Sequence, residues 1–439
     1  MSTDTRTGGR PATQAVIGGG LAIAVGKPTA PTPDGFEWRP LNQLARLETG
    51  HTPSRRHPEY WNGEIPWIGI RDATGNHGRT ITQTLQTFTQ EGLDNSSARL
   101  LPAGTVCLSR TASVGFVVVM GVPMATSQDF VNWVCGPELD PRYLKYVLQA
   151  DREALLRFAN GSTHQTIYFP EVKAFHALLP PIEDQRAIAA TLGALDDKID
   201  SNRRVEALGL ALLDVMSEQV GEVLPETPLG EVAAMTRVTV NPGGFGTQVV
   251  EHFSLPAFDA GARADAVAGE SILSNKIQIP GNCILVSRLN PRTNRTWWVT
   301  TKPDIPALAS TEWDCLTARD RPALAGMWLA VRDPIFRQEL ANRVTGTSGS
   351  HQRVRPDDLQ SIPVPDFRGL PQTATLQALS VIDEIEHRRS ESAVLADLRD
   401  ALLPELLSGR TRVAAEVIKD HALEEETAGG IPNTAIRAQ

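Results

Sequence analysis

The feature that most constrains the fold of this chain is an internal repeat with a period of roughly 180 residues. "LNQLA" from Leu41 returns as "LGEVA" from Leu229, and "LPAGTVCLSR", ending at Arg110, returns as "IPGNCILVSR", ending at Arg288. Solenoid repeats are much shorter, so this period indicates a duplicated domain. Further pairs follow in the same order: Trp133 and Cys135 with Trp313 and Cys315, "GSTHQTI" from Gly161 with "GTSGSHQRV" from Gly346, and "LPPIEDQ" from Leu179 with "IPVPDF" from Ile362.

Each repeat begins with a module that mixes strands and helices. Short apolar runs such as "TVCL", "GFVVVM" and "CILVS" predict strands, while residues 143–158 and 327–342 read as helices. We place module one at residues 36–182 and module two at residues 229–365. The expected fold class is therefore two α/β (α+β) modules related by a pseudo-twofold internal repeat.

A long helix is predicted after each module. Pro180 and Pro181 precede a proline-free stretch, which predicts a helix over residues 183–222. A second helix is predicted over residues 372–410, ending at Pro404 or in the "LLSGR" that follows. Such lengths favour two antiparallel coiled-coil helices between the modules, as in a dumbbell. The expected seam of the first helix has a stutter near Asn202: it runs through Ile188, Leu192, Leu195 and Ile199, then resumes at Val205, Leu208, Leu212 and Val215.

The two ends of the chain carry weaker signals. Residues 1–35 have a short apolar run diluted by three glycines, Gly18 to Gly20, and are read as a disordered leader, while residues 411–439 form a tail. No segment is apolar enough to cross a bilayer. The four cysteines lack disulfide or metal-ligand spacing, so we expect a cytoplasmic protein with neither a metal site nor a membrane partner.

The distribution of charge separates the helices from the modules. The chain carries 42 basic and 51 acidic side chains, which argues against non-specific coating of nucleic acid. The first long helix alone holds nine acidic and four basic side chains, whereas both modules are near neutral. Basic residues gather locally, at Arg55 and Arg56 and at three arginines between 288 and 295. Any such cluster can equally be a solvated surface.

Motifs for catalysis are missing. Residues 20–27, "GLAIAVGK", miss a phosphate-binding loop by one residue and lack the Ser or Thr that should follow the lysine. Neither a nucleophile elbow nor a zinc-protease, kinase or dinucleotide motif occurs. We therefore expect no catalytic residue and no cofactor on this chain.

The modules instead offer polar and guanidinium side chains where apolar strands end. Ser109, Arg110, Thr111 and Ser113 follow one strand, and Asn290, Arg292, Asn294 and Arg295 follow its repeat. Arginine can pair with guanine and an amide with adenine, which makes Gln165 and Gln352 candidates as well. For Arg110 and Arg288 the alternative is a structural ion pair with an acidic neighbour.

In these features the chain resembles the specificity (S) subunit of type I restriction-modification systems. The matching pieces lie between residues 36 and 410, and the longest, "NGSTHQTIYFPEVKAFHALLPPIEDQRAIAATLGALDDKID", is the most specific. The second half departs from the pattern, with "FRGLPQTATL" in place of "IEDQRAIAATL". The candidate DNA-binding residues are Arg71, Ser109, Arg110, Thr111, Ser113, Gln128, Ser162, Thr163, His164, Gln165, Ser287, Arg288, Asn290, Arg292, Asn294, Arg295, His351, Gln352 and Arg353.

The resemblance implies a non-catalytic subunit with two target recognition domains, each reading one half of a bipartite site in double-stranded DNA. The helices would set the spacing between the halves and dock two methylating (M) subunits, and motor-nuclease (R) subunits would complete the complex. S-adenosylmethionine, ATP and Mg are then expected on those partners and not on this chain. The alternative is an orphan specificity-like regulatory protein that binds partner subunits or DNA without supporting modification.

Overall fold

The computed structural model describes residues 11–159, 165–344 and 352–413. Its contacts divide the chain into two compact units. Unit 1 combines residues 1–199 with residues 393–439, and unit 2 spans residues 200–392. Module one therefore lies in unit 1 and module two in unit 2, and the division between the units cuts both long helices.

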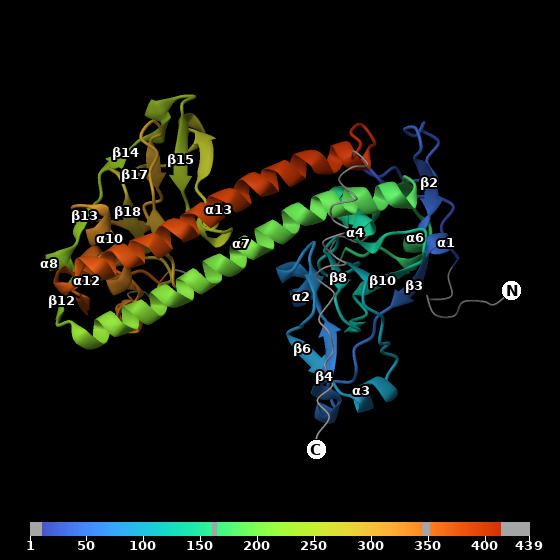
Figure 1. The fold of residues 1–439 in the computed structure, drawn as a ribbon, viewed down its shortest axis with the longest axis horizontal. Coiled ribbons are helices and arrows are strands. Elements are labelled where there is room, and N and C mark those ends of the chain that lie inside the picture. The colour runs from blue at the N-terminus through green and yellow to red at the C-terminus, as the bar shows by residue number, and fades with distance from the viewer. Residues whose placement is uncertain (1–10, 160–164, 345–351, 414–439) are drawn as a thin grey trace, which may run out of the picture. The chain divides into compact units, whose positions relative to one another are not determined.

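The two long helices occur where the sequence predicts them (Figure 1). Helix α7 spans Ile182–Val223 and helix α13 spans Gln372–Leu407. Pro404 lies inside the last turn of α13, so this helix ends in the "LLSGR" segment rather than at the proline. No helix in the described ranges is long and apolar enough to cross a bilayer.

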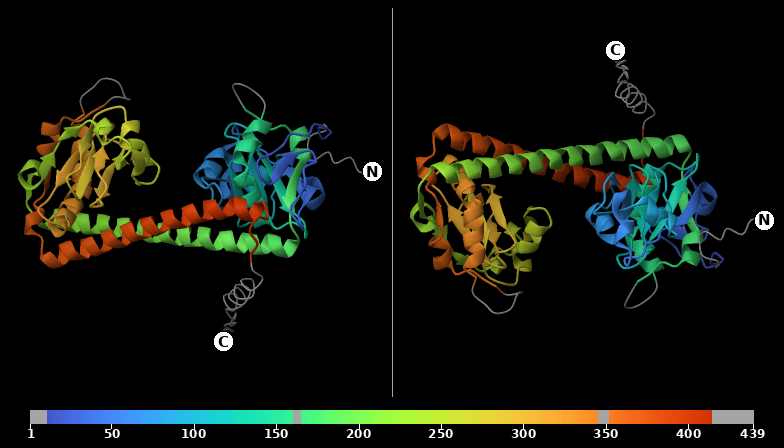
Figure 2. Two further views of the ribbon diagram at one scale, coloured as in Figure 1. Left: turned by 90° about the horizontal axis from the view of Figure 1, so that it is seen from above. Right: turned by 90° about the horizontal axis from the view of Figure 1, so that it is seen from below.

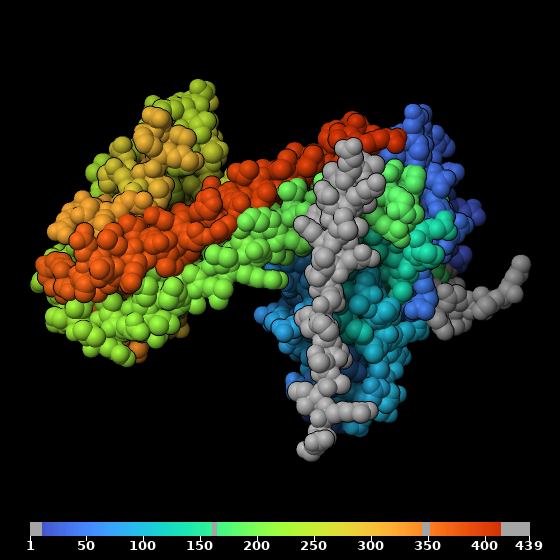
Figure 3. All heavy atoms as spheres, viewed as in Figure 1, coloured from blue at the N-terminus to red at the C-terminus, as the bar shows by residue number. Residues whose placement is uncertain are grey.

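Within unit 2 the two helices pack against each other in antiparallel order. Asn202 donates from Nδ2 to Ser392 Oγ at 3.3 Å, and Glu206 pairs with Arg389 at 2.7 Å. Further along, a Cβ on Gly209 would lie 3.0 Å from the side chain of Ile385, so the glycine lets the helices approach closely. The contact along this part of the pair is visible in Figure 3.

The predicted stutter in α7 is wrong. Leu208, Leu212 and Val215 are exposed by 71%, 49% and 50%, so the second half of the expected seam faces outward. The buried and half-buried positions continue the first half with steps of four and three residues, an unbroken heptad. Periodicity of apolar residues does not reveal them, because the polar and small residues Asn202, Glu206 and Gly209 interrupt the apolar ones. The seam consists of Ile188, Leu192, Leu195, Ile199, Asn202, Glu206, Gly209, Leu213, Met216 and Val220.

Unit 1 contains three sheets, with strand orders β1-β11-β2, β3-β10-β7-β8-β5 and β6-β4-β9. Most neighbouring strands are antiparallel, but β5 pairs with β8 and β4 with β9 in parallel. Strands β7 and β8 occur at the predicted "TVCL" and "GFVVVM" runs. The strands are β1 Ile23–Val25, β2 Glu37–Pro40, β3 Ala45–Thr49, β4 Trp61–Ile68, β5 Thr80–Ile81, β6 Gln86–Phe88, β7 Val106–Ser109, β8 Val117–Met120, β9 Ala125–Thr126, β10 Phe130–Cys135 and β11 Phe175–Leu179.

In unit 2 the described residues also form three sheets, with strand orders β12-β22, β13-β21-β18-β19 and β14-β17-β20-β15-β16. In both views of Figure 2 these sheets lie on one side of the part of α7 and α13 that belongs to unit 2. The strands are β12 Glu226–Pro228, β13 Ala234–Thr236, β14 Thr239–Val240, β15 Val249–Phe253, β16 Asp265–Ala268, β17 Lys276–Gln278, β18 Cys283–Ser287, β19 Thr296–Val299, β20 Ala307–Ala309, β21 Trp313–Thr317 and β22 Pro363–Pro365.

Both predicted module helices are broken by an aspartate. Residues 143–158 fall in α4 and α5, which meet at Asp151, and residues 327–342 fall in α10 and α11, which meet at Asp333. The α-helices are α1 Leu41–Leu44, α2 Ile70–Gly75, α3 Gln90–Asp94, α4 Pro141–Ala150, α5 Arg152–Phe158, α6 Phe169–Lys173, α8 Leu229–Val232, α9 Leu255–Asp259, α10 Arg321–Arg332, α11 Pro334–Asn342 and α12 Pro356–Gln360. Helices of the 3-10 type are η2 Pro58–Tyr60, η3 Pro242–Phe245, η4 Gly269–Ser271 and η5 Phe367–Gly369.

The prediction of a disordered leader over residues 1–35 is wrong from residue 11 onward. Strand β1 pairs antiparallel with β11, and its three residues are fully buried. The carboxylate of Asp151 accepts hydrogen bonds from the backbone N–H groups of Leu21, Ala22 and Ile23 at 2.5, 2.5 and 2.7 Å. Gly20 is required there, because a Cβ would lie 2.1 Å from the carboxylate. One of the glycines that dilute the apolar run is therefore what allows this close approach.

Strand registers test the repeat directly. Leu41 and Leu229 begin equivalent helices and are both fully buried, which confirms that "LNQLA" and "LGEVA" are equivalent. The predicted equivalence of the two Trp-x-Cys segments is wrong. Ser109 pairs with Phe130 whereas Ser287 pairs with Trp313, so Trp313 corresponds to Phe130 and not to Trp133. Because a sheet repeats every two residues, similar side chains recur at neighbouring positions and imitate equivalence.

The last predicted pair of the repeat, Leu179 with Ile362, is displaced by four residues. Pro40 pairs with His176 and its equivalent Pro228 pairs with Pro363, so Ile362 corresponds to Phe175 and not to Leu179. The "LPP" and "IPVP" segments resemble each other only because both end a strand before a helix. The duplication itself holds for the central sheet and the strands beside it, since β3-β10-β7-β8 recurs as β13-β21-β18-β19 and β11-β2 recurs as β22-β12, whereas the third sheets differ in strand order.

Candidate nucleic-acid interface

The Ser-Arg turns occupy equivalent places in the two modules. In module one, Arg110 donates its backbone N–H to Asp129 O at 2.8 Å and accepts at its carbonyl from Ile167 at 2.8 Å. In module two, Arg288 donates to Glu312 O at 2.9 Å and accepts from Val354 at 3.1 Å. Each arginine therefore joins three separate segments: the end of the central strand, the loop before the neighbouring strand, and the segment that follows the predicted Gly-Ser turn.

The side chain of Arg110 is held within this edge. Its Nη2 donates to Gln128 O at 3.1 Å, and its guanidinium lies 4.8 Å from the ring centroid of Phe169. Nε is buried without a hydrogen-bond partner. Burial lowers the pKa of Arg110, and the nearby carboxylate of Asp129 opposes that shift. Arg110 thus ties the Gln128 loop to the strand end, the kind of structural role that the sequence left open.

The side chain of Arg288 is also held by a backbone carbonyl, and it lies in addition beside a buried acid. It donates from Nη2 to Thr311 O, and its Nε lies 3.6 Å from Asp314 Oδ2. Arg237 approaches the other carboxylate oxygen at 3.7 Å. Asp314 is fully buried, and neither oxygen has a hydrogen-bond partner. Burial raises the pKa of Asp314 to about 6, although both arginines act to lower it.

The first serine of each turn faces inward. Ser109 is fully buried, donates to Ser113 O and accepts from Phe116 N at 2.9 Å. Ser287 is 2% exposed and bonds within its own turn, to Leu289. In this conformation neither hydroxyl is available to DNA, because both are used to shape the turn. Sequence could not separate this role from ligand contact, since serine suits both.

The structure brings several other candidates of module one together. Thr111 bonds Thr166 between their hydroxyls at 2.7 Å, which places the exposed Gln165 beside the turn. Gln128 is exposed and accepts from Thr52. Arg71 is exposed on α2, three residues beyond Ile68, whose carbonyl accepts from Ser127 of the Gln128 loop at 3.0 Å. We call this continuous set of segments the module-one edge: residues 50–57, 68–71, 109–113, 126–129 and 165–166.

The module-two edge consists of residues 237, 287–295, 310–314 and 352–353. Arg353 forms a bidentate pair with Glu312 at 2.7 and 3.0 Å, and Arg295 forms another with Asp259 at 2.7 and 2.8 Å. Both acids have a pKa lowered by these bonds. The paired carboxylates, together with Asp314, were missed by sequence reasoning, although an acid within the apolar "WDCL" strand was a usable signal.

The remaining candidates of module two lie in one turn. Asn290 adopts a left-handed backbone, with φ of 49°, and donates its N–H to Gln352 O at 2.9 Å. Arg292 and Asn294 are exposed, and Asn294 accepts from Thr296 at 2.9 Å. Four candidates lie outside the described residues: Ser162, Thr163, His164 and His351.

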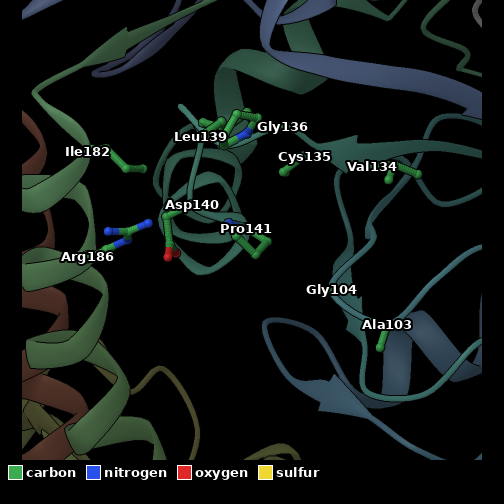
Figure 4. A pocket seen from close by; sticks show the side chains of 11 residues that line it. Ala103, Gly104, Val134, Cys135, Gly136, Leu139, Asp140, Pro141, Ile182 and Arg186 are labelled. Atoms are coloured by element: carbon green, nitrogen blue, oxygen red, sulfur yellow. The ribbon is translucent and has the colours of Figure 1, made fainter. Parts of the chain in front are cut away.

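A hollow in unit 1 lies at the opposite end of the same strands (Figure 4). Its charged lining residues are Asp140, which caps α4, and Arg186, which pairs with Glu183 at 3.0 Å. Burial raises the pKa of the Cys135 thiol to about 12, so this thiol is not activated. Among the described residues no group of His, Cys, Asp and Glu could hold a metal ion.

The buried acid gives a testable pH dependence. Since the pKa of Asp314 is raised to about 6 from 3.8, the unfolded chain loses this proton first, and stability falls as pH rises between those values. About two pKa units correspond to roughly 3 kcal/mol. Asp314→Asn should therefore raise the unfolding free energy of unit 2 by about 1–3 kcal/mol at neutral pH and leave it unchanged near pH 4. Denaturant unfolding across this pH range measures it; a less stable variant at neutral pH would mean that Asp314 is a net stabilising partner of Arg288.

Comparisons with known proteins agree with the resemblance. The model of the type I restriction modification DNA specificity domain matches residues 33–208. The MjaIX specificity subunit of Methanocaldococcus jannaschii is 28% identical over 174 residues, 39% of this chain and 40% of that relative. A type I restriction enzyme specificity subunit of Escherichia coli is 27% identical over 173 residues, 38% of this chain and 42% of that relative. The matches thus span less than half of these relatives.

A solved structure extends the likeness to most of the chain. The type I restriction-modification S subunit from M. genitalium superposes with a TM-score of 0.57 over 87% of this chain and 98% of that one, at 14% identity. This agreement concerns the fold alone. The domain match shows that residues 33–208 belong to the type I restriction modification DNA specificity domain family, and over about two fifths of its length the chain is similar to type I specificity subunits.

Proposed function

We propose that this chain is the DNA sequence-specificity subunit of a type I restriction-modification complex. Each module binds one half of a bipartite target in double-stranded DNA. The observation that carries the proposal is the recurrence of one construction in both modules, an arginine that ties a strand end to two polar loops. A target with two separated halves requires two DNA-binding modules.

The exposed members of each edge are proposed to contact DNA, and the buried ones to shape it. In module one the contacts come from Arg71, Gln128 and Gln165, and in module two from Arg292 and Asn294. Ser109, Arg110, Ser287 and Arg288 act mainly through the loops they hold. Ser113, Thr111, Asn290, Arg295, Gln352 and Arg353 border these contacts, and Ser162, Thr163, His164 and His351 belong to the same proposal.

The helices are proposed to set the spacing between the two halves and to dock methylating subunits. Leu208, Leu212 and Val215 form an exposed apolar stripe on α7, and Val394 and Leu398 are exposed by 64% and 45% on α13. Exposed apolar stripes of this kind are typical of protein-binding surfaces. The nine acidic side chains of the first helix add charge that a basic partner surface would complement.

Under this proposal the chain is a non-catalytic member of its complex. Methyl transfer with S-adenosylmethionine and DNA cleavage with ATP and Mg would take place on two methylating subunits and on the motor-nuclease subunits. The test is to express the chain with its methylating subunits and sequence the methylome. We expect one bipartite methylated motif that disappears when this chain is omitted. Methyl transfer by the chain alone, or an unchanged methylome without it, would refute the proposal.

Arg110 and Arg288 provide a test of the division into halves. Arg110→Ala should release the Gln128 loop and weaken recognition of only one half of the target, by about 1–3 kcal/mol. Arg288→Ala should do the same to the other half. Binding to duplexes randomised in one half at a time measures both effects, with each variant as the control for the other. Equal losses in both halves from either substitution would contradict the assignment.

A further inference from the structure

Arg55 of the module-one edge is fixed by aromatic stacking. Its guanidinium lies 3.9 Å from the ring centroid of Trp61 and 5.4 Å from that of Trp67. The two indoles meet edge to face at 5.3 Å, and Trp67 is buried. Arg55 also donates from Nη2 to Gln86 Oε1 at 2.8 Å. The side chain is nevertheless exposed, so a rigid, oriented guanidinium is presented to solvent.

The charge of Arg55 is not matched by an acid in the described part of the chain. No ion pair within 4.0 Å connects Arg55 to a carboxylate there, and the bond to Gln86 leaves its charge uncompensated. In the module-two edge Arg295, Arg353 and Arg288 each face a carboxylate, and the exposed Arg292 makes no cation–π contact with the described residues. A guanidinium held by neutral rings keeps its positive charge and its remaining donors for an external anion.

The loop that carries Arg55 is joined to the rest of the module-one edge. His51 donates its N–H to Thr126 O at 2.9 Å, and Thr52 donates to the side chain of Gln128. A Cβ on Gly50 would lie 2.0 Å from Ser127 O, so the two loops are in close contact. Arg55 therefore extends the same edge that Arg110 and Gln128 form.

Among the described residues, module two has no arginine stacked on two indoles. Its arginine close to an indole ring is Arg332, which lies 5.5 Å from the ring centroid of Trp328 and pairs with Asp214 at 2.7 Å. The exposed, stacked arginine is therefore a feature of module one.

We infer that Arg55 binds a backbone phosphate of the DNA at the half-site of module one, a contact that module two lacks. The inference rests on the proposed function. A phosphate accepts from a guanidinium without regard to base, so this contact positions the module on the duplex and leaves the sequence preference to other residues. Its signature is electrostatic, because each neutralised phosphate releases counterions and adds about 0.9 to the slope of log K against log salt.

The experiment compares matched variants of the full chain in binding duplex DNA of mixed sequence over a series of salt concentrations. Arg55→Gln should lower the salt slope by about one and weaken binding about tenfold at low salt. Arg55→Lys should keep the slope, since lysine retains the charge. Arg142→Gln is the control: it removes the same charge from an exposed position at the start of α4, next to the hollow at the opposite strand ends, and should leave the slope unchanged.

Equal slopes for Arg55→Gln and Arg142→Gln would overturn the inference. So would loss of preference at a single base with the slope intact, because that result identifies a base reader. Thermal melting of each variant checks that the module stays folded, and Trp61→Phe, which keeps a ring under the guanidinium, should bind as the unaltered chain does. If the unaltered chain shows no salt-dependent binding to duplex DNA, the proposed function fails together with this contact. If the unaltered chain binds but Arg55→Gln leaves the salt slope unchanged, only the Arg55 contact is refuted and the proposed function stands.

Discussion

Lengthening both long helices by one heptad should lengthen the unread gap in the DNA target by about three base pairs. Seven residues add roughly 10 Å of helix at about 1.5 Å per residue, and one base pair occupies about 3.4 Å. The insertions belong between Ile199 and Asp200 in α7 and between Ser392 and Ala393 in α13. These are the points at which contacts divide the chain into its two units, so the contacts within each unit are preserved.

A whole heptad is needed because the seam of α7 is continuous. Ile199 and Asn202 are both buried and three residues apart, so seven additional residues restore the same phase at Asn202. Four additional residues would turn the buried face by roughly 50° about the helix at 3.5 residues per turn. That change would move Asn202 away from Ser392 and Glu206 away from Arg389.

The readout is the methylome of cells that express the variant with its methylating subunits. A heptad in α7 alone is the control, because the unmatched helix cannot pair along its new length and methylation should fail. If the doubly lengthened chain methylates a motif with the original gap, the helices do not set the spacing. If it methylates nothing although it folds, the added turns must disturb the docking of partners.

Asp151→Ala should destabilise unit 1 by about 3–5 kcal/mol. The carboxylate is 2% exposed and accepts from three consecutive backbone N–H groups, which would be left buried without partners. Each such group costs about 1–3 kcal/mol. Without this anchor, β1 should detach from β11, so amide hydrogen exchange of residues 21–25 should become fast.

Asp333→Ala is the matched control in unit 2. Asp333 occupies the equivalent helix junction but caps α11, accepting from Ile335 N at 2.7 Å. Loss of a single cap should cost about 1 kcal/mol. Asp151→Asn keeps one acceptor oxygen and should fall between the two. Equal losses for Asp151→Ala and Asp333→Ala would mean that the N-terminal segment contributes little to unit 1.

The sequence predicts long-range order here better than local detail. Repetition locates both modules and both helices because duplicated packing must reuse the same apolar positions, as Leu41 and Leu229 do. The seam of α7 was misplaced because it contains two polar residues, Asn202 and Glu206, which pair with Ser392 and Arg389, and periodicity counts only apolar side chains. Polar positions of this kind are visible only once the partner is known.

The candidate interface shows the same limit. The two Ser-Arg turns were found because strand ends followed by small and polar residues are recognisable. Their partners were not, since Asp314, Glu312 and Gln128 reach the arginines from loops and strands that are distant in sequence. The role of residues 11–35 was missed for a similar reason, because the segment is held by Asp151, a residue that is distant in sequence.

Strand β1 also has a consequence for solubility. Three residues of β1 cover one side of β11, a strand that contains no proline and therefore keeps every N–H as a donor. In the part of the chain that the structure describes, the corresponding β22 pairs with β12 alone, but Pro363 and Pro365 withhold two of its three donors. The edges of β11 and β22 are thus protected from edge-to-edge pairing in two different ways, by an added strand in one copy and by imino acids in the other. A chain that began after Val25 would lose the first protection only, and its association should then proceed through β11.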